Sequence, residues 1–223
     1  MKENMAIKTL IAGAGQNGSQ VYNILKLDPR IEVVAFLDDD PGKKDSEKYG
    51  LPVAGEVAQA AALAEKMGAT GAIAAMGNNY LRAKINQQLA EAGLGIVSAI
   101  HPHTFIDDTA SIGEGAIVEM GVMIHPHARL GRNVFVGGST VIAHDCIIGN
   151  HVLLGGGVVF GGDVQVGDYC TLGVGSILQP HLRIGCNVIT GIGAVVVKDL
   201  PDNSVAVGVP AKVIRHQDPP PAL

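Results

Sequence analysis

The sequence predicts two joined folds, a small α/β domain followed by a parallel β-helix. An apolar position recurs every six residues through nearly half of the chain, a period that fits neither an α-helix nor an alternating strand. The preceding region instead alternates strand-like and helix-like segments around a glycine-rich turn. Thirty glycines and no tryptophan suit an architecture of tight turns and small stacked side chains. We expect an α/β domain over 1–97, a β-helix over 98–200 and a C-terminal extension over 201–223.

Composition narrows the class of protein. With 47% hydrophobic and 17% charged residues, the 223-residue chain is expected to fold compactly. A net charge of −5 does not favour a broad basic surface for nucleic acid, so we expect no nucleic-acid partner. No apolar run reaches transmembrane length and no signal peptide is recognisable, which favours a cytoplasmic protein without membrane insertion. Cys146, Cys170 and Cys186 are then expected to stay reduced.

The six-residue repeat runs without a slip in register, and sixteen of its seventeen positions are bulky and apolar. These positions are Ile100, Ile106, Ile112, Val118, Ile124, Leu130, Val136, Ile142, Ile148, Leu154, Phe160, Val166, Leu172, Leu178, Ile184, Thr190 and Val196. Four residues after each one, the side chain is usually small or β-branched, as in Ala116, Val134 and Cys146. We interpret each hexapeptide as a short strand and a corner, with three to a coil and the apolar residues stacked inside.

The corners of these coils have a characteristic composition. Gly115, Asn133 and Asn187 lie three residues past the apolar position. Glycine and asparagine adopt a left-handed backbone conformation at low cost, so these corners are expected to be left-handed. The spacing does not by itself fix the handedness of the coil.

The N-terminal region reads as a small parallel sheet with helices. Strands are expected at 8–12, 31–37 and 71–75, and helices at 19–27, 56–67 and 80–91. Fewer than 100 residues supply only half of a dinucleotide-binding fold, so a full dinucleotide site is not expected.

Three strand ends in this region carry residues suited to a nucleotide. Gly13, Gly15 and Gly18 form G-x-G-x-x-G between a strand and a helix, where glycines let the backbone approach phosphate. Asp38 and Asp39 end the second strand, about where such folds bind a ribose or base edge. The segment Gly77-Asn78-Asn79 follows the third strand. All three lie at the carboxyl edge of the sheet, and together they predict nucleotide binding.

The end of the β-helix and the extension that follows it resemble a known enzyme class. Val197-Lys198-Asp199-Leu200-Pro201 and Val207-Gly208-Val209-Pro210-Ala211-Lys212 are similar to the ending of acyl-CoA-dependent hexapeptide transferases. The whole chain resembles the bacterial nucleotide-sugar N-acetyltransferases of the pilin-glycan and perosamine type, together with the sialic-acid O-acetyltransferase-like proteins. This resemblance implies a left-handed β-helix behind a Rossmann-like domain, and a homotrimer with acyl-CoA in the groove between neighbouring β-helices.

The resemblance also implies roles for individual residues. The segment Val141–Gly149 matches the family's histidine segment, which makes His144 the catalytic base and Asp145 its supporting carboxylate. Nucleotide-sugar contacts are expected from Gly13, Gly15, Gln16, Asn17, Asp38, Asp39, Gly77 and Asn78. Contacts to acetyl-CoA are expected from Gly162, Val174, Ile192 and Lys212. Relatives often have histidine where this chain has Asn17.

The resemblance, together with these features, implies an acetyl-CoA-dependent N-acetyltransferase acting on a UDP- or GDP-linked amino sugar in surface-glycan biosynthesis. A sugar O-acetyltransferase of the sialic-acid type and a non-catalytic nucleotide-sugar-binding protein remain alternatives. Many relatives have a second histidine at the register of Leu153, whereas here His151 comes two residues early. A zinc site is not expected, because His144 and His151 are seven residues apart, whereas the zinc-binding histidines of related β-helices are typically five apart.

Overall fold

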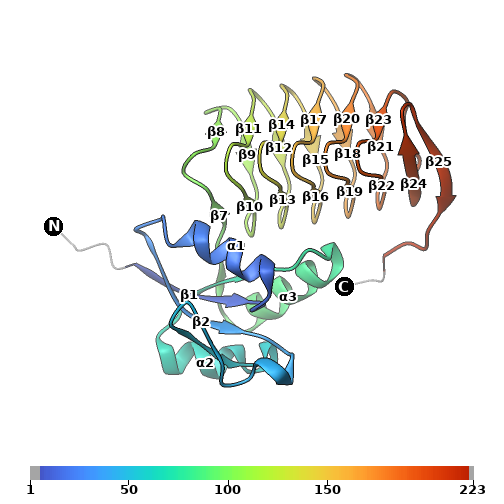
Figure 1. Cartoon of the computed structure of the whole chain (residues 1–223). Coiled ribbons are helices and arrows are strands. Elements are labelled where there is room, and N and C mark those ends of the chain that lie inside the picture. Colours follow the sequence, from blue (N-terminus) through green and yellow to red (C-terminus); the bar gives the residue numbers. More distant parts are fainter. Residues whose placement is uncertain (1–5, 221–223) are drawn as a thin grey trace. The chain divides into compact units, whose positions relative to one another are not determined.

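The computed structural model describes residues 6–220, in which two compact units meet between Pro102 and His103. The sequence predicts this boundary at residue 97, five residues earlier. Unit 1 contains the α/β domain and unit 2 contains the β-helix (Figure 1). No helix within residues 6–220 is long and apolar enough to span a membrane.

Unit 1 is built on a six-stranded sheet with the order β3-β4-β2-β1-β5-β6. Every neighbouring pair is parallel except β3 and β4, which form an antiparallel hairpin. The strands are β1 (Ile7–Ala12), β2 (Ile31–Leu37), β3 (Glu47–Lys48), β4 (Leu51–Gly55), β5 (Gly71–Ala74) and β6 (Gly95–Ile96). The helices are α1 (Gln16–Leu25), the 3-10 turns η1 (Pro41–Lys43) and η2 (Val57–Gln59), α2 (Ala60–Met67) and α3 (Asn79–Glu91).

The three expected strands and three expected helices of unit 1 are present, with shifted ends. Helix α1 begins at Gln16 rather than at residue 19, so the residues between the last two glycines of G-x-G-x-x-G are already helical. Residue 56 does not begin an α-helix, because η2 precedes α2. The hairpin β3–β4 and the edge strand β6 are not expected from the sequence.

Unit 2 is a stack of triangular coils, shown in Figure 1 running from green to red. Strands pair in parallel with the strand eighteen residues further on, as Met123 does with Val141. One sheet, the apolar sheet, contains β8 (Phe105–Ile106), β11 (Met123–Ile124), β14 (Val141–Ile142), β17 (Val159–Phe160), β20 (Ile177–Leu178) and β23 (Val195–Val196). A second contains β9 (Ser111–Ile112), β12 (Arg129–Leu130), β15 (Ile147–Ile148), β18 (Gln165–Val166) and β21 (Arg183–Ile184).

The third sheet of unit 2 ends in a hairpin. It contains β10 (Ile117–Val118), β13 (Phe135–Val136), β16 (Leu153–Leu154), β19 (Thr171–Leu172), β22 (Ile189–Thr190), β24 (Ser204–Gly208) and β25 (Ala211–His216). Strand β24 is parallel to β22, and β25 returns antiparallel to β24. The predicted C-terminal extension therefore continues the β-helix sheet. Strand β7 (Ala99–Ile100) also belongs to this sheet, at the end next to β10, and the boundary between the two compact units follows β7 in the chain.

The six-residue register predicts the core of unit 2 almost residue by residue. Val118, Ile124 and Ile142 are fully buried, and so is Cys146 at the small-residue position. Ile100 is an exception: it is 36% exposed rather than stacked inside the coil. The core of buried residues begins at Ala116, so the register starts one coil before the core does.

The corners adopt the expected left-handed conformation. Gly115, Asn133 and Asn187 have φ values of 70°, 55° and 54°. The corners form three edges along the coils. The edge that precedes the apolar sheet, here the glycine edge, comprises 119–121, 137–139, 155–157, 173–175 and 191–193. The edge that follows it, here the histidine edge, comprises 125–127, 143–145, 161–163, 179–181 and 197–199.

Candidate active site

Unit 1 contains a pocket of about 530 Å³ at the carboxyl ends of β1, β2 and β5. All eight residues predicted to bind a nucleotide sugar line it: Gly13, Gly15, Gln16, Asn17, Asp38, Asp39, Gly77 and Asn78. The structure therefore brings together three sequence segments that are far apart in the chain.

The glycine-rich turn of this pocket depends on close backbone packing. Gly13 has φ 107°, and a Cβ atom there would stand 3.0 Å from the carbonyl oxygen of Ala75. A Cβ atom on Gly18 would collide with the carbonyl of Gly13. Any larger residue would push the turn away from β5, so glycine is required at both positions.

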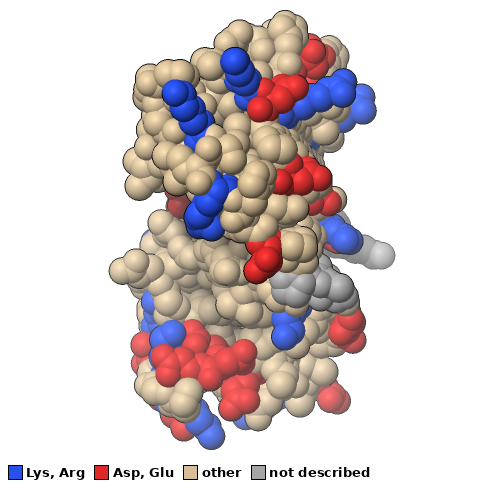
Figure 2. Space-filling view, turned by 90° about the vertical axis from the view of Figure 1, so that its right-hand side faces the viewer, with Lys and Arg blue, Asp and Glu red and all other residues tan. Residues whose placement is uncertain are grey.

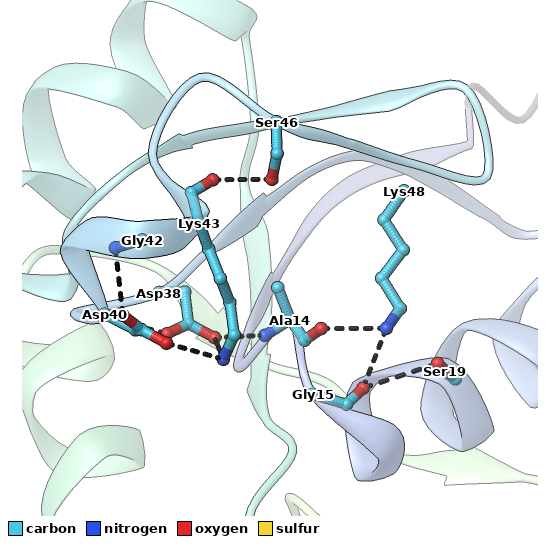
Figure 3. A network of polar contacts seen from close by, with 9 residues as sticks. All are labelled: Ala14, Gly15, Ser19, Asp38, Asp40, Gly42, Lys43, Ser46 and Lys48. Carbon is cyan, nitrogen blue, oxygen red and sulfur yellow. Dashed lines mark hydrogen bonds and ion pairs between the residues drawn. The ribbon is translucent and has the colours of Figure 1, made fainter.

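Asp38 holds this turn in place. Its Oδ2 accepts from the backbone N–H of Ala14 at 2.7 Å and from Nζ of Lys43 at 2.9 Å, and its Oδ1 accepts from the N–H of Asp40 (Figure 3). Burial raises the pKa of Asp38, but the hydrogen bonds from Lys43, Asp40 and Ala14 outweigh it and the pKa falls below 3.8. The carboxylate thus stays charged and orients the turn.

Asp39 is also engaged by the protein backbone. Its Oδ1 accepts from the N–H of Val57, at the start of η2, at 2.8 Å. Asp39 therefore links the end of β2 to the segment that leads into α2. Both acidic residues lie in the pocket as expected, and both also fix its walls.

The turn between β5 and α3 forms the opposite wall. The side chain of Asn78 caps α3 by accepting from the N–H of Leu81 at 2.8 Å. The fully buried Arg82 donates to the carbonyl of Met76 at 2.9 Å and to Oδ1 of Asn79 at 2.8 Å. Burial lowers the pKa of Arg82 to about 10, so it remains a cation at neutral pH. These contacts fix the position of Gly77 at the pocket.

The second candidate site lies in unit 2, on the histidine edge. Nδ1 of His144 lies 2.8 Å from Oδ2 of Asp145, which has a left-handed corner conformation with φ 59°. A carboxylate only accepts hydrogen bonds, so the contact assigns the proton to Nδ1 and leaves Nε2 with a lone pair in the neutral ring. Both side chains are more than half exposed, so a substrate can reach them.

Gly162 supports the imidazole from the next coil. A Cβ atom at Gly162 would stand 2.5 Å from Nε2 of His144 and 2.6 Å from its Cε1. The ring therefore packs directly against the Gly162 backbone, and a side chain there would displace it. His144, Asp145 and Gly162 form one constellation suited to taking a proton from a bound nucleophile.

A second histidine–carboxylate pair lies one coil further along the same edge. Nδ1 of His181 is 3.0 Å from Oδ2 of Asp163. Sequence reasoning missed this pair because the two residues are eighteen apart in the chain. The repeat could have found it, because residues eighteen apart are neighbours on adjacent coils.

The four residues expected at acetyl-CoA lie on different parts of unit 2. Val174 and Ile192 are exposed at equivalent positions of the glycine edge. Gly162 lies on the histidine edge, on the other side of the apolar sheet. Lys212 lies on β25, opposite Val207 of β24.

His151 and the cysteines are not part of these constellations. His151 is buried at a corner of the third edge, where its ring stacks on Tyr169 with a centroid distance of 4.8 Å. Cys146 and Cys170 are buried and Cys186 is exposed. Within residues 6–220, no group of three or more histidine, cysteine or acidic side chains is arranged to hold a metal ion.

Several residues of the unit 1 pocket were not predicted from the sequence. Val57, Ala75, Met76, Leu81 and Ile85 also line it. Leu81 and Ile85 are four apart on α3, a spacing that could have indicated a shared face. No comparable spacing of residues in the sequence indicated the hairpin β3–β4.

A β-helix of hexapeptide coils with an exposed histidine–aspartate pair defines the class of hexapeptide acyltransferases. Two family models match the sequence: the PglD N-terminal domain over residues 8–89 and the bacterial transferase hexapeptide (six repeats) over 109–144, 127–162 and 145–180. No protein with a curated description matches it.

Solved structures extend this likeness to nearly the whole chain. PerB from Caulobacter crescentus, in complex with CoA and GDP-perosamine, is 33% identical, with 92% of this chain and 96% of that chain covered and a TM-score of 0.86. The acetyltransferase domain of PglB from Neisseria gonorrhoeae, in complex with acetyl coenzyme A, is 27% identical over 94% of this chain and 100% of that chain, with a TM-score of 0.87. WeeI from Acinetobacter baumannii shares the fold at 24% identity, with coverages of 94% and 100% and a TM-score of 0.80.

The chain belongs to the family of bacterial nucleotide-sugar acetyltransferases built on hexapeptide repeats, and it is an acyltransferase. The predicted family and the predicted fold class, an α/β domain followed by a left-handed β-helix, are confirmed.

Proposed function

We propose that the protein transfers the acetyl group of acetyl-CoA to the amino group of a UDP- or GDP-linked amino sugar, in surface-glycan biosynthesis. The observation that carries this proposal is the pairing of His144 with Asp145 over Gly162, in a chain of this family. Support comes from PerB, which was solved with CoA and GDP-perosamine, including in variants of one of its histidines.

His144 acts as the general base. Asp145 holds the proton on Nδ1, so Nε2 is free to accept a proton from the sugar amine as its nitrogen attacks the thioester carbon. A carbon–nitrogen bond forms, the carbon–sulfur bond breaks, and the imidazolium returns its proton to the departing thiolate. The products are the N-acetylated sugar and CoA.

Transfer is direct, without an acyl-enzyme. Cys146 follows Asp145 in the chain, but its side chain is buried and its Sγ donates to the carbonyl of Gly161 at 3.3 Å. Burial raises the pKa of the Cys146 thiol, which disfavours the nucleophilic thiolate.

The pocket of unit 1 binds the nucleotide sugar. The backbone of Gly15, Gln16 and Asn17 at the start of α1 receives the diphosphate, because this helix end presents N–H donors. Asp38 and Asp39 contact the base or ribose through the carboxylate lone pairs that their hydrogen bonds within the protein leave free.

The enzyme works as a homotrimer with acetyl-CoA between neighbouring β-helices. The outward residues of the apolar sheet form a continuous apolar row: Phe105, Met123, Val141, Val159, Ile177 and Val195. Four of them are 39–54% exposed, a patch that favours association. This sheet lies between the histidine and glycine edges, so packing it against a second copy brings His144 of one chain near Val174 and Ile192 of the next.

We propose the cytoplasm as the compartment of the reaction. The three cysteines form no disulfide with one another.

An acetylation assay with free-thiol detection tests the proposal. UDP- and GDP-linked amino sugars are offered with acetyl-CoA, together with the matching hydroxyl sugars and CMP-sialic acid. We expect thiol release with an amino sugar and a product heavier by one acetyl group on nitrogen. Acetylation of a hydroxyl sugar alone, or no turnover with any nucleotide sugar, would overturn it.

A further inference from the structure

Lys48 stands against the glycine-rich turn of the nucleotide pocket. It lies in β3, more than thirty residues along the chain from that turn. Its Nζ donates to the carbonyl oxygen of Ala14 at 2.8 Å and to that of Gly15 at 3.0 Å (Figure 3). A lysine that reaches two consecutive carbonyl groups fixes the orientation of two consecutive peptide planes.

These two peptide planes carry the donors at the start of α1. In a trans peptide, the C=O and the following N–H point in opposite directions. The carbonyls of Ala14 and Gly15 face Lys48, so the N–H groups of Gly15 and Gln16 face away from it. Gly15 and Gln16 both line the pocket, at a helix end whose first N–H groups have no partner inside the helix. The Gly15 carbonyl also accepts from the N–H of Ser19 at 3.1 Å and from its hydroxyl at 3.3 Å, so Lys48 shares the Gly15–Gln16 plane with α1. Lys48 therefore helps to orient the donors that a phosphate would use, chiefly through the Ala14–Gly15 plane.

Lys48 also supplies charge next to a pocket that two carboxylates line. These are Asp38 and Asp39, and acidic side chains also gather on one area of the face of unit 1 seen in Figure 2. Lys43 is paired with Asp38 at 2.9 Å, which neutralises its charge locally. The ion pairs found among residues 6–220 do not include Lys48. Its ammonium, bound to carbonyl oxygens, therefore adds a positive charge that no carboxylate neutralises.

The hairpin holds Lys48 against α1. The ring of Tyr49, the next residue, stacks on Tyr22 of α1 at a centroid distance of 4.5 Å and an interplanar angle of 10°. Ser19 of α1 lowers the pKa of the Tyr49 hydroxyl, with smaller effects from Asn23 and the nearby lysines. The stacking of Tyr49 on Tyr22 thus helps to place Lys48, which does not depend on its own flexible chain alone.

We infer that Lys48 is a positioning residue for the diphosphate of the nucleotide sugar: it aims the N–H groups of Gly15 and Gln16 into the pocket and offsets the charge of the bound phosphates. This inference rests on the proposed function, because it assumes that the pocket receives a nucleoside diphosphate. Lys48 acts from the carbonyl side of the turn and does not line the pocket.

The test compares Lys48→Met with Lys48→Arg and with the matched control Lys44→Met. Lys44 is an exposed lysine of the same segment, so its replacement removes the same charge from the same part of the chain. Dissociation constants are measured for GDP and UDP by calorimetry, and for guanosine and uridine by ligand-observed NMR. Steady-state kinetics give KM for the nucleotide sugar and for acetyl-CoA.

We expect Lys48→Met to weaken the diphosphate about tenfold and to raise KM for the nucleotide sugar by a similar factor. Nucleoside affinity, kcat and KM for acetyl-CoA should change by less than about twofold. Lys48→Arg, which keeps the charge and two donors, should recover most of the affinity, and Lys44→Met should match the wild type.

Two results would overturn the inference and leave the proposed function standing. One is an unchanged affinity of Lys48→Met for GDP and UDP. The other is an equal loss of affinity for the nucleoside and the diphosphate, which would show a merely structural role. A wild-type protein that binds neither GDP nor UDP would instead refute the proposed function, and the inference with it.

Discussion

Replacing Gly162 by alanine tests the link between the histidine edge and catalysis. The new Cβ atom would stand 2.5 Å from Nε2, 2.6 Å from Cε1 and 3.2 Å from Nδ1 of His144. Non-bonded carbon atoms prefer about 3.5–4.0 Å, so the ring must move by roughly 1 Å. A misplacement of about 1 Å at a reacting group can cost about 10²-fold in rate, and we expect kcat to fall by that order.

The fold should survive this change. Gly162 does not have a positive φ, and the His144 side chain is 64% exposed, so the ring can swing into solvent. Thiol release measured at saturating substrates gives kcat, and thermal unfolding checks the fold. Gly95→Ala is the control, because its Cβ atom would meet only the carbonyl of Thr70, at 3.5 Å.

A double variant decides whether Gly162 acts through His144. If it does, His144→Ala combined with Gly162→Ala should lose no more activity than His144→Ala alone. A folded Gly162→Ala enzyme with wild-type kcat would show that Gly162 does not position His144. So would a raised KM for acetyl-CoA at unchanged kcat, which would assign Gly162 to the cosubstrate only.

Two further predictions concern stability and assembly. Asp38→Asn should lower the free energy of unfolding at pH 7 by about 1–3 kcal/mol, because Asp38 accepts charged and backbone hydrogen bonds in the folded state. The pKa of Asp38 lies below its ordinary 3.8, so its contribution to the free energy of unfolding is complete above about pH 3.8 and disappears as the pH falls through the folded-state pKa. Urea titrations across that range should therefore give the same free energy of unfolding for the wild type and Asp38→Asn at the lowest pH. A difference that persists there would contradict the assignment. Ile177→Glu should split the proposed trimer, since Ile177 is 46% exposed in the apolar row, whereas Gln165→Glu on the neighbouring sheet should leave it intact. Light scattering after gel filtration gives the mass, and an unchanged oligomer in Ile177→Glu would exclude this sheet as the interface.

The fold was predictable because its rules are local and repeated. A six-residue period demands that each apolar residue stack on its equivalent in the next coil, which is why Val118 and Ile142 are buried as expected. The same register predicts the left-handed corners at Asn133 and Asn187. It fails at Ile100 because a residue at the end of a stack has an equivalent on only one side.

The pocket was predictable in its residues but not in its internal contacts. Strand ends of a parallel sheet meet at one edge, so Gly15, Asp38 and Gly77 could be grouped from the sequence. The hydrogen bond from Ala14 to Asp38 spans 24 residues, and the reach of Lys48 to the glycine-rich turn spans more than 30. The first contact depends on how the end of β2 meets the turn and the second on where the hairpin β3–β4 lies, and no local pattern encodes either geometry.

The proposed mechanism requires that His144 remove the proton of the attacking amine. The most direct measurement is acetyl transfer to a UDP- or GDP-linked amino sugar by the wild type and by His144→Ala, with nucleotide affinity measured on the same samples. We predict that His144→Ala loses most of its turnover, by about 10²–10⁴-fold, while its affinity for the nucleoside diphosphate stays unchanged. Near-normal turnover in His144→Ala would contradict the account.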